Sequence, residues 1–547
     1  MKRISTSLRR MQKMTLSPAV VVAIALLICM PFFRVAAGPS GTSSVTVQPS
    51  TLAGPSSTLK VANGQLQRSS DSAPFLLISD AGYDIMRAVP PAGNGRANMA
   101  NYFSTLQSVG FNASIEQAFV FSDRTGKAYD GTMPFTTSLP GCAPADQEPC
   151  WDISTPNPAY WKQVVAMVNL AGQYGVIIEL LTIAGGGCAS DSPMQMLINN
   201  GQPKDYNFGV FLGNTFKTLP NIIWYHGDDY SCFNISSTDN LMYAMAQGIQ
   251  STGDIHIQTM ELCGPYVKRS LFLFPTSPAG YCAPSGAGLS FPTSLDDTTN
   301  NWASILKINW VYQYGTTFQQ ALHAYTQSPS TPVFLGEINW AGSDGNTGSV
   351  PGCQTSAQVA MAPYCPIRQR QEVWWTATFG AYWGASVGRN TSGPYHDFAY
   401  PSPIPVVPDT QFIYLANFMK SIPWYKLQPS PGGSNSIVTA GYGSNAAGTT
   451  LSSAYVTSSL AADGSLAVIY FPNANQGPIT VNMAKMASGV TAKWYDPTAD
   501  PTQSGSYTTI CSPSGTACST GSQSFTNPLT HSDGSRDAVL LLTTTTG

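Results

Sequence analysis

Charged side chains are scarce in this sequence. Its 547 residues include 26 Lys and Arg, 29 Asp and Glu and five His, so Asp, Glu, Lys and Arg make up only 10%, against about 25% in an average soluble protein. A nucleic-acid-binding protein needs a basic face, which this composition excludes. Disorder is excluded as well, because 43% of the residues are hydrophobic and 11% are aromatic. We expect a folded protein with no nucleic-acid partner.

Several motifs are also absent. The sequence contains neither HExxH nor CxxC, and its few histidines show no metal-ligand spacing. A mean hydropathy of -0.03 argues against a protein with many membrane spans. We therefore expect no metal and no cofactor.

The N-terminus is typical of a secretion signal. Five basic residues precede an apolar run of about 16 residues at 18–33, which is short for a bilayer that needs about 20. Small residues at 35–38 offer a cleavage site. Removal of residues 1–37 leaves 20 basic against 29 acidic residues. We expect a secreted or periplasmic protein with no stable membrane insertion after cleavage, and an uncleaved signal anchor is the alternative.

Ten of the eleven cysteines lie beyond this segment, an even number that suits disulfides in an exported chain. Short spacings favour the pairs Cys142–Cys150, Cys353–Cys365 and Cys511–Cys518. The remaining four would pair among themselves, and they are Cys188, Cys232, Cys263 and Cys282.

From residue 74 onward, short apolar runs alternate with amphipathic stretches. The expected strands are 74–82, 111–121, 176–185, 221–229, 256–262, 307–315, 332–340 and 385–390. The expected helices are 95–110, 158–175, 207–219, 239–251, 296–306, 316–328 and 367–384. Regular alternation predicts a parallel sheet, and eight units predict a (β/α)8 TIM barrel. An open doubly wound sheet is the alternative, but no glycine-rich phosphate loop follows any expected strand.

The ends of the chain differ from this pattern. Residues 38–73 are rich in Ser, Gly, Thr and Pro and are typical of a linker, with one short strand at 59–62. After about residue 429, strand-like runs alternate with turns and no helix is expected. We predict a barrel domain over 74–428 and a small all-β sandwich over 429–547.

Acidic residues gather at the expected ends of the barrel strands, where barrel enzymes carry functional side chains. The polar and aromatic residues on these strands include Asp80, Tyr83, Glu116, Glu179, His226, Asp228, Asp229, His256, Glu261, Glu337 and Trp340. Glycosidic cleavage needs two carboxylates across one bond, one to donate a proton and one to attack or to activate water. A carboxylate of strand four and Glu337 of strand seven would face each other across the mouth. Structural roles are the alternative, such as a helix cap at Asp80 or core hydrogen bonds at the histidines.

At these residues the chain resembles the apiosidase-like glycoside hydrolases. The matching segments include NIIWYHGDDY (221–230), PVFLGE (332–337) and RQEVWWTATFGAYWG (370–384). In the first, Asp229 stands at the family's aspartate position, and in the last, Arg370 matches a family arginine. LAVIYFPN (466–473) and AKWYDPTA (492–499) resemble the β-sandwich often appended to this family, which carries a collagen-binding label.

This resemblance implies a secreted glycosidase of plant cell-wall glycans, with apiose-containing pectin as the family's named substrate. It implies Asp229 as acid/base and Glu337 as nucleophile. The residues expected to bind the oligo- or polysaccharide are Asp80, Tyr83, Glu116, His226, Asp228, His256, Trp340, Arg370 and Trp383. A non-catalytic carbohydrate-binding or adhesion protein on a degenerate barrel is the main alternative, and a metal-dependent hydrolase is a third.

Overall fold

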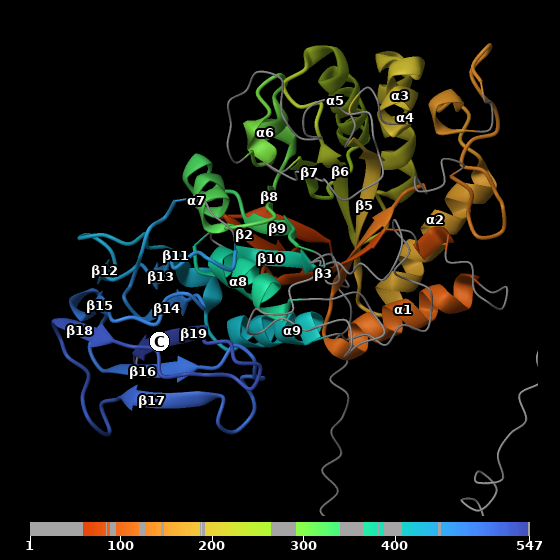
Figure 1. Cartoon of the computed structure of the whole chain (residues 1–547). Helices are drawn as coiled ribbons and strands as arrows, with labels where there is room; N and C mark the ends of the chain where they lie inside the picture. The colour runs from red at the N-terminus through yellow and green to blue at the C-terminus, as the bar shows by residue number, and fades with distance from the viewer. Residues whose placement is uncertain are drawn as a thin grey trace, which may run out of the picture. The chain divides into compact units, whose positions relative to one another are not determined.

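Figure 1 shows a computed structural model of the chain, coloured from the N-terminus to the C-terminus. The structure describes residues 58–83, 85–87, 95–119, 126–143, 147–185, 188, 192–263, 292–339, 365–379, 382–387, 407–446 and 450–544. The expected signal segment lies outside these ranges. Within them, no helix has the length and apolar character that a membrane crossing requires.

Eight parallel strands form the central sheet. They are β3 (Leu77–Tyr83), β4 (Ala113–Gln117), β5 (Ile177–Ala184), β6 (Ile222–Tyr230), β7 (Gln258–Leu262), β8 (Asn309–Tyr312), β9 (Val333–Glu337) and β10 (Tyr382–Val387). Hydrogen bonds link them in the order β7-β6-β5-β4-β3-β10-β9-β8. An isolated parallel bridge joins Gln258 of β7 to Leu306, three residues before β8, so the sheet closes on itself. The predicted (β/α)8 barrel is confirmed.

Helices surround this barrel and connect its strands (Figure 1). They are α1 (Gly95–Val109), α2 (Pro158–Gln173), α3 (Ser192–Asn200), α4 (Gln202–Phe216), α5 (Ser236–Ser251), α6 (Trp302–Ile305), α7 (Phe318–Gln327), α8 (Pro366–Ala377) and α9 (Val407–Lys420). The start of α2 follows from the sequence: Pro158 occupies the first turn, and the Asn157 side chain accepts a hydrogen bond from the Ala159 N–H at 3.1 Å.

The prediction of one helix over 367–384 was wrong at its end. α8 stops at Ala377, and Tyr382 already begins β10. Gly384 pairs with Leu77 of β3 at a φ of 152°, and a Cβ there would lie 2.1 Å from the Leu77 carbonyl oxygen. Only glycine permits this close approach, so pairing with β3 overrides the helical pattern of the preceding residues.

One end of the barrel is closed by a hairpin. β1 (Leu59–Ala62) pairs with β2 (Gln65–Arg68), so the strand expected at 59–62 is confirmed. Leu59 and Leu66 of this hairpin pack in one apolar cluster with inward residues of the barrel strands. The Phe75 N–H, just before β3, donates to the Leu66 carbonyl at 2.8 Å. The hairpin therefore covers the N-terminal end of the barrel, which leaves the C-terminal mouth for a site.

Two antiparallel sheets form the C-terminal region. The larger contains β11 (Leu427–Pro429), β13 (Thr457–Ala461), β14 (Leu466–Phe471), β19 (Ala538–Thr544), β16 (Val490–Tyr495) and β17 (Tyr507–Cys511). The smaller contains β12 (Val438–Ala440), β15 (Ile479–Asn482) and β18 (Ser522–Phe525). Ile469 and Leu540 of the larger sheet share a core with Ile479 and Phe525 of the smaller one. This shared core makes the region a sandwich, as predicted.

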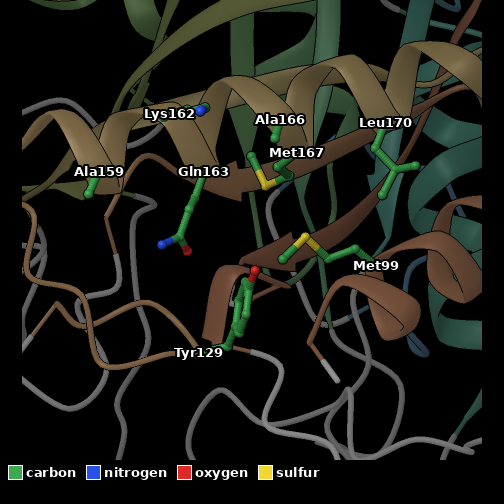
Figure 2. Close-up of a pocket in the computed structure, with 8 residues that line it drawn as sticks. All are labelled: Met99, Tyr129, Ala159, Lys162, Gln163, Ala166, Met167 and Leu170. Carbon is green, nitrogen blue, oxygen red and sulfur yellow. The ribbon is translucent and has the colours of Figure 1, made fainter. Parts of the chain in front are cut away.

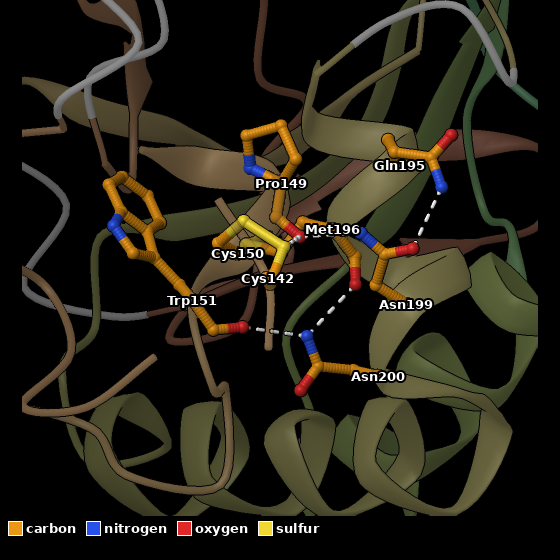
Figure 3. The surroundings of a disulfide bond; sticks show 8 residues. All are labelled: Cys142, Pro149, Cys150, Trp151, Gln195, Met196, Asn199 and Asn200. Atoms are coloured by element: carbon orange, nitrogen blue, oxygen red, sulfur yellow. Dashed lines mark hydrogen bonds between the residues drawn. A yellow bond between two sulfur atoms is a disulfide. The ribbon is translucent and has the colours of Figure 1, made fainter. Parts of the chain in front are cut away.

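Disulfides fasten several loops. Cys142–Cys150 and Cys511–Cys518 form as predicted, and Cys188 pairs with Cys232. Cys263 and Cys365 are disulfide-bonded too, whereas Cys282 and Cys353 lie outside the described residues. Figure 3 shows the first bond beside α3, where Asn199 and Asn200 donate to the carbonyl oxygens of Pro149 and Trp151 at 2.7 and 2.8 Å. These contacts attach the disulfide loop to the helix.

The larger sheet of the sandwich packs on α8 through a buried ion pair. Arg370 donates from Nε and Nη2 to the two carboxylate oxygens of Asp537 at 2.7 and 2.6 Å. Tyr470 donates to the same carboxylate at 3.0 Å, and Gln411 accepts from Arg370 Nη1 at 2.7 Å. The guanidinium holds the pKa of Asp537 well below its usual range despite burial. This corrects the expectation that Arg370 binds substrate, because its donors are committed to the domain contact.

Replacing Arg370 by leucine tests this contact. We expect Arg370→Leu to lower the free energy of unfolding by about 3–5 kcal/mol, because Asp537 then stays buried without its charged partner. Urea unfolding of the purified chain measures the effect. Lys426→Ala is the matched control: it breaks an exposed pair with Asp463 at 3.1 Å, and little change is expected. Equal, small effects of both variants would contradict the assignment.

Candidate active site

Four carboxylates gather at the C-terminal mouth of the barrel. Asp228 and Asp229 stand near the end of β6, Glu261 lies in β7, and Glu337 is the last residue of β9. Carboxylate oxygens of Asp228, Glu261 and Glu337 lie within 4.8 Å of one another. Glu261 is fully buried and Glu337 is 7% exposed, whereas the two aspartates are half-buried. The mouth thus concentrates negative charge that the protein must accommodate.

The end of β6 has an unusual backbone. Gly227, Asp228 and Asp229 have φ values of 99°, 56° and 58°, so three consecutive residues lie in the left-handed region. Residues other than glycine rarely adopt it, and each costs on the order of 1–3 kcal/mol. Pairing with β7 shifts register between His226 and Tyr230. The strand therefore breaks its alternation where the acidic residues stand.

Tyrosine hydroxyls bind three of the four carboxylates. Asp228 Oδ1 accepts from Tyr83 at 3.1 Å and lies 3.4 Å from the Tyr225 hydroxyl. The Tyr225 hydroxyl also lies against Glu261 Oε2, and the Tyr314 hydroxyl donates to Glu337 Oε1.

Burial, and then the nearby carboxylates, raise the pKa of all three phenols well above its usual value. The phenols therefore remain protonated donors. Hydrogen bonds of this kind stabilise the ionised form of Asp228 and Glu337.

The charge of Asp229 acts on two further tyrosines at the mouth. Its charge is the largest electrostatic influence on the buried hydroxyl of Tyr312, and it also raises the pKa of Tyr314. The charge of Glu337 raises the pKa of both tyrosines as well. The charges of Asp229 and Glu337 thus both act on these two tyrosines, while Asp228 contacts Tyr83 and Tyr225.

Packing inside the barrel holds these donors in place. The rings of Tyr225 and Trp310 stack with centroids 4.6 Å apart and an angle of 8° between their planes. Trp310 covers Gly336, where a Cβ would lie 1.4 Å from the indole nitrogen. Glycine just before Glu337 therefore makes room for the tryptophan that supports Tyr225.

Glu261 is a site residue to which sequence reasoning gave no role. Burial raises its pKa well above the usual value, and the charges of Glu337, Asp228 and Asp229 raise it further. Its Oε1 atom is buried and has no hydrogen-bond partner among the residues that the structure describes. Burial and the neighbouring charges thus both favour the neutral form of Glu261.

Asp80 and Glu116 lie away from the mouth, outside the wall of the barrel. Tyr102 of α1 donates to Asp80 Oδ2 at 2.7 Å and lies 2.8 Å from the Ser114 hydroxyl, which donates to Glu116 Oε1 at 2.7 Å. A Cβ on Gly82 would meet Glu116 Oε1 at 2.2 Å. This network attaches α1 to β3 and β4, which corrects the expectation of substrate contacts.

The two histidines are structural as well. His226 points outward from β6, with Nδ1 2.8 Å from the Thr182 hydroxyl and Nε2 2.9 Å from Gln258 Oε1. Burial lowers its pKa to about 4, so it is neutral. His256 precedes β7 at the N-terminal end of the barrel, where Nε2 donates to the Leu219 carbonyl at 2.6 Å. Neither reaches the carboxylates.

The two tryptophans expected at the site have different outcomes. Trp383 stands near the start of β10, buried in the cluster that includes the hairpin residues Leu59 and Leu66, with its ring centroid 6.2 Å from that of Trp424. It belongs to the closed end of the barrel, which corrects its assignment to substrate. Trp340 lies outside the described residues.

A separate hollow of about 210 Å³ lies on the outer side of the barrel, between α1 and α2 (Figure 2). Its lining residues are Met99, Tyr129, Ala159, Lys162, Gln163, Ala166, Met167 and Leu170. It contains no carboxylate and no paired acid and base, so it offers none of the groups that hydrolysis needs.

Three clustered carboxylates also have the donor type of a divalent-cation site. Here, however, the phenols of Tyr83, Tyr225 and Tyr314 each contact one oxygen of these carboxylates. They compete for the lone pairs that a cation would need. The arrangement therefore suits proton chemistry better than metal binding.

Comparisons with known proteins agree with this geometry. The family described as "Apiosidase-like, catalytic domain" matches residues 62–432, and the one described as "Putative collagen-binding domain of a collagenase" matches 446–543. No curated protein sequence matches the chain.

Solved structures share the fold. A structure described as a glycoside hydrolase has a TM-score of 0.62 and 16% identity, covering 90% of this chain and 98% of its own. A family 5 glycoside hydrolase from Bacteroides vulgatus has a TM-score of 0.61 and 15% identity, covering 90% and 93%. With two thirds of its length matched by the first family and with a barrel mouth of facing carboxylates, the chain belongs to the apiosidase-like family of glycoside hydrolases.

Proposed function

We propose that this chain is a secreted enzyme that cleaves apiose-containing side chains of pectin, with Asp229 as acid/base and Glu337 as nucleophile. The observation that carries the proposal is the position of these two carboxylates at the ends of β6 and β9, on opposite sides of one barrel mouth. Glycosidic cleavage requires such a facing pair. The substrate is the one for which the family is named.

Hydrogen bonds distinguish the roles of the acids. Glu337 accepts from Tyr314, which favours the ionised form that a nucleophile needs. Asp228 accepts from the Tyr83 phenol, which likewise favours its ionised form and makes it a poor proton donor. Asp229, its neighbour in the sequence, is then the acid that protonates the leaving oxygen.

The catalytic pair is tested by charge removal. We expect Glu337→Gln and Asp229→Asn each to lower kcat/KM by roughly 10²–10⁴-fold while thermal unfolding stays close to that of wild type. The assay measures sugar release from apiose-containing pectin beside a panel of other cell-wall polysaccharides.

Asp463→Asn is the matched control, because it removes an exposed carboxylate in the sandwich. If Asp228→Asn were inactive and Asp229→Asn active, the acid would be Asp228. Carbohydrate binding with no hydrolysis of any glycan would instead indicate a binding protein.

Stereochemistry tests the role of Glu337 directly. A carboxylate nucleophile forms a glycosyl-enzyme intermediate, and its hydrolysis by water retains the anomeric configuration. We expect proton NMR of early products to show the retained anomer. An inverted first product would make Glu337 a base that activates water, and the nucleophile assignment would be wrong.

A further inference from the structure

Glu261 is a buried acid at the mouth that the proposed mechanism does not use. It reaches the mouth from β7, between the strand of the aspartates and the β8 strand, and its side chain is fully buried. Its oxygens lie within 4.8 Å of those of Asp228 and Glu337. Three ionised carboxylates cannot share so small a buried volume, because each repels the others and has lost most of its hydration.

The two carboxyl oxygens of Glu261 differ in their contacts, and the difference indicates which of them carries a proton. Its Oε2 atom is bound by the Tyr225 hydroxyl, whereas Oε1 is buried without a partner in the described part of the chain. A buried polar atom without a partner is costly, and a carboxylic acid can remove that cost by donating to a neighbouring carboxylate. Among its charged neighbours, Glu337 has the largest effect on Glu261.

We propose that Glu261 is a positioning residue that acts as a neutral acid, donating a hydrogen bond from Oε1 to the carboxylate of Glu337 and so fixing the nucleophile in line with the sugar. The inference rests on the proposed role of Glu337. Two donors then hold Glu337, Tyr314 from just after β8 and Glu261 from β7, and no third negative charge opposes its ionised form.

Several titratable groups face Glu261. They are Tyr225, Asp228 and Asp229 of β6, Glu337 of β9, Tyr83 of β3 and Tyr312 of β8. The phenols among them have pKa values raised well above the ordinary range. Loss of the Glu261 proton therefore adds a negative charge that none of these groups offsets, and it replaces a donor to Glu337 with a repelling carboxylate. Activity should fall on the alkaline side for this reason.

Two substitutions separate this role from others. Glu261→Gln keeps the shape and a hydrogen-bond donor but cannot ionise, so we expect kcat/KM at neutral pH to stay within about threefold of wild type. We also expect the alkaline limb of the pH–activity profile, the pH at which activity falls on the alkaline side, to move up by at least about one pH unit. Glu261→Ala removes the donor, and we expect kcat to fall by about 10²-fold with a smaller change in KM.

Asp205→Asn is the control for burial alone. Burial raises the pKa of Asp205, on α4, to about 8, yet this residue is not at the mouth. Its variant should leave the alkaline limb where wild type has it. An equal shift in both variants would mean that the limb reports stability, and the proposal would be overturned.

A readout without substrate completes the test. The infrared difference spectrum between wild type and Glu261→Gln should show the loss of a protonated carboxyl band at neutral pH, and absence of this loss overturns the proposal. Glu261→Gln activity as low as that of Glu261→Ala, or wild-type activity lost with chelator and restored by Ca²⁺, also overturns it. Failure of the proposed function is separate: an active Glu337→Gln would show it whatever the Glu261 variants do.

Discussion

Repulsion among four carboxylates at one end of the barrel is the constraint on which the rest of the site depends. Asp228, Glu261 and Glu337 have oxygens within 4.8 Å of one another, and the charge of Asp229 acts on the same pocket. The protein has few positively charged side chains to offset this repulsion, because only 10% of its residues are charged. Neutral donors offset part of the repulsion instead: phenols donate hydrogen bonds to Asp228 and Glu337, and burial favours the protonated form of Glu261.

The C-terminal sandwich takes part in this arrangement. Thr450 of the sandwich donates to Glu372 Oε1 at 2.7 Å, and Glu372 Oε2 in turn accepts from the Asn339 backbone N–H at 3.1 Å. Asn339 stands two residues after Glu337. Arg370, on the same helix, holds Asp537 of the sandwich. The domain that carries a collagen-binding description thus supports the strand end that carries the proposed nucleophile, and such a role requires no ligand of its own.

Much of this fold follows from sequence periodicity. Eight apolar runs separated by helical stretches specify the barrel, because each strand must be covered by a helix on its outer face. Individual side chains were harder to place. The ends of the strands identify the rim of the barrel. The side chains of Asp80 and His226, however, point outward from their strands, where they contact α1 and the neighbouring strands. Arg370 was misassigned because only the folded chain brings Asp537 beside it, 167 residues away.

The alternation of inward and outward side chains along a strand also bears on Glu261, which was given no role from the sequence, and on the two adjacent aspartates, which were expected at the site. In QTMEL (258–262) Gln258 and Met260 face outward, so Thr259 and Glu261 must face the barrel interior, and this alternation marks Glu261 for the mouth. The same rule would allow only one of Asp228 and Asp229 to face inward. The left-handed backbone from Gly227 to Asp229 suspends the rule, so that one aspartate reaches Tyr83 and Tyr225 while the next acts on Tyr312 and Tyr314. Local strain at the end of β6 is therefore the physical means by which a single strand brings two adjacent carboxylates, Asp228 and the proposed proton donor Asp229, to one mouth.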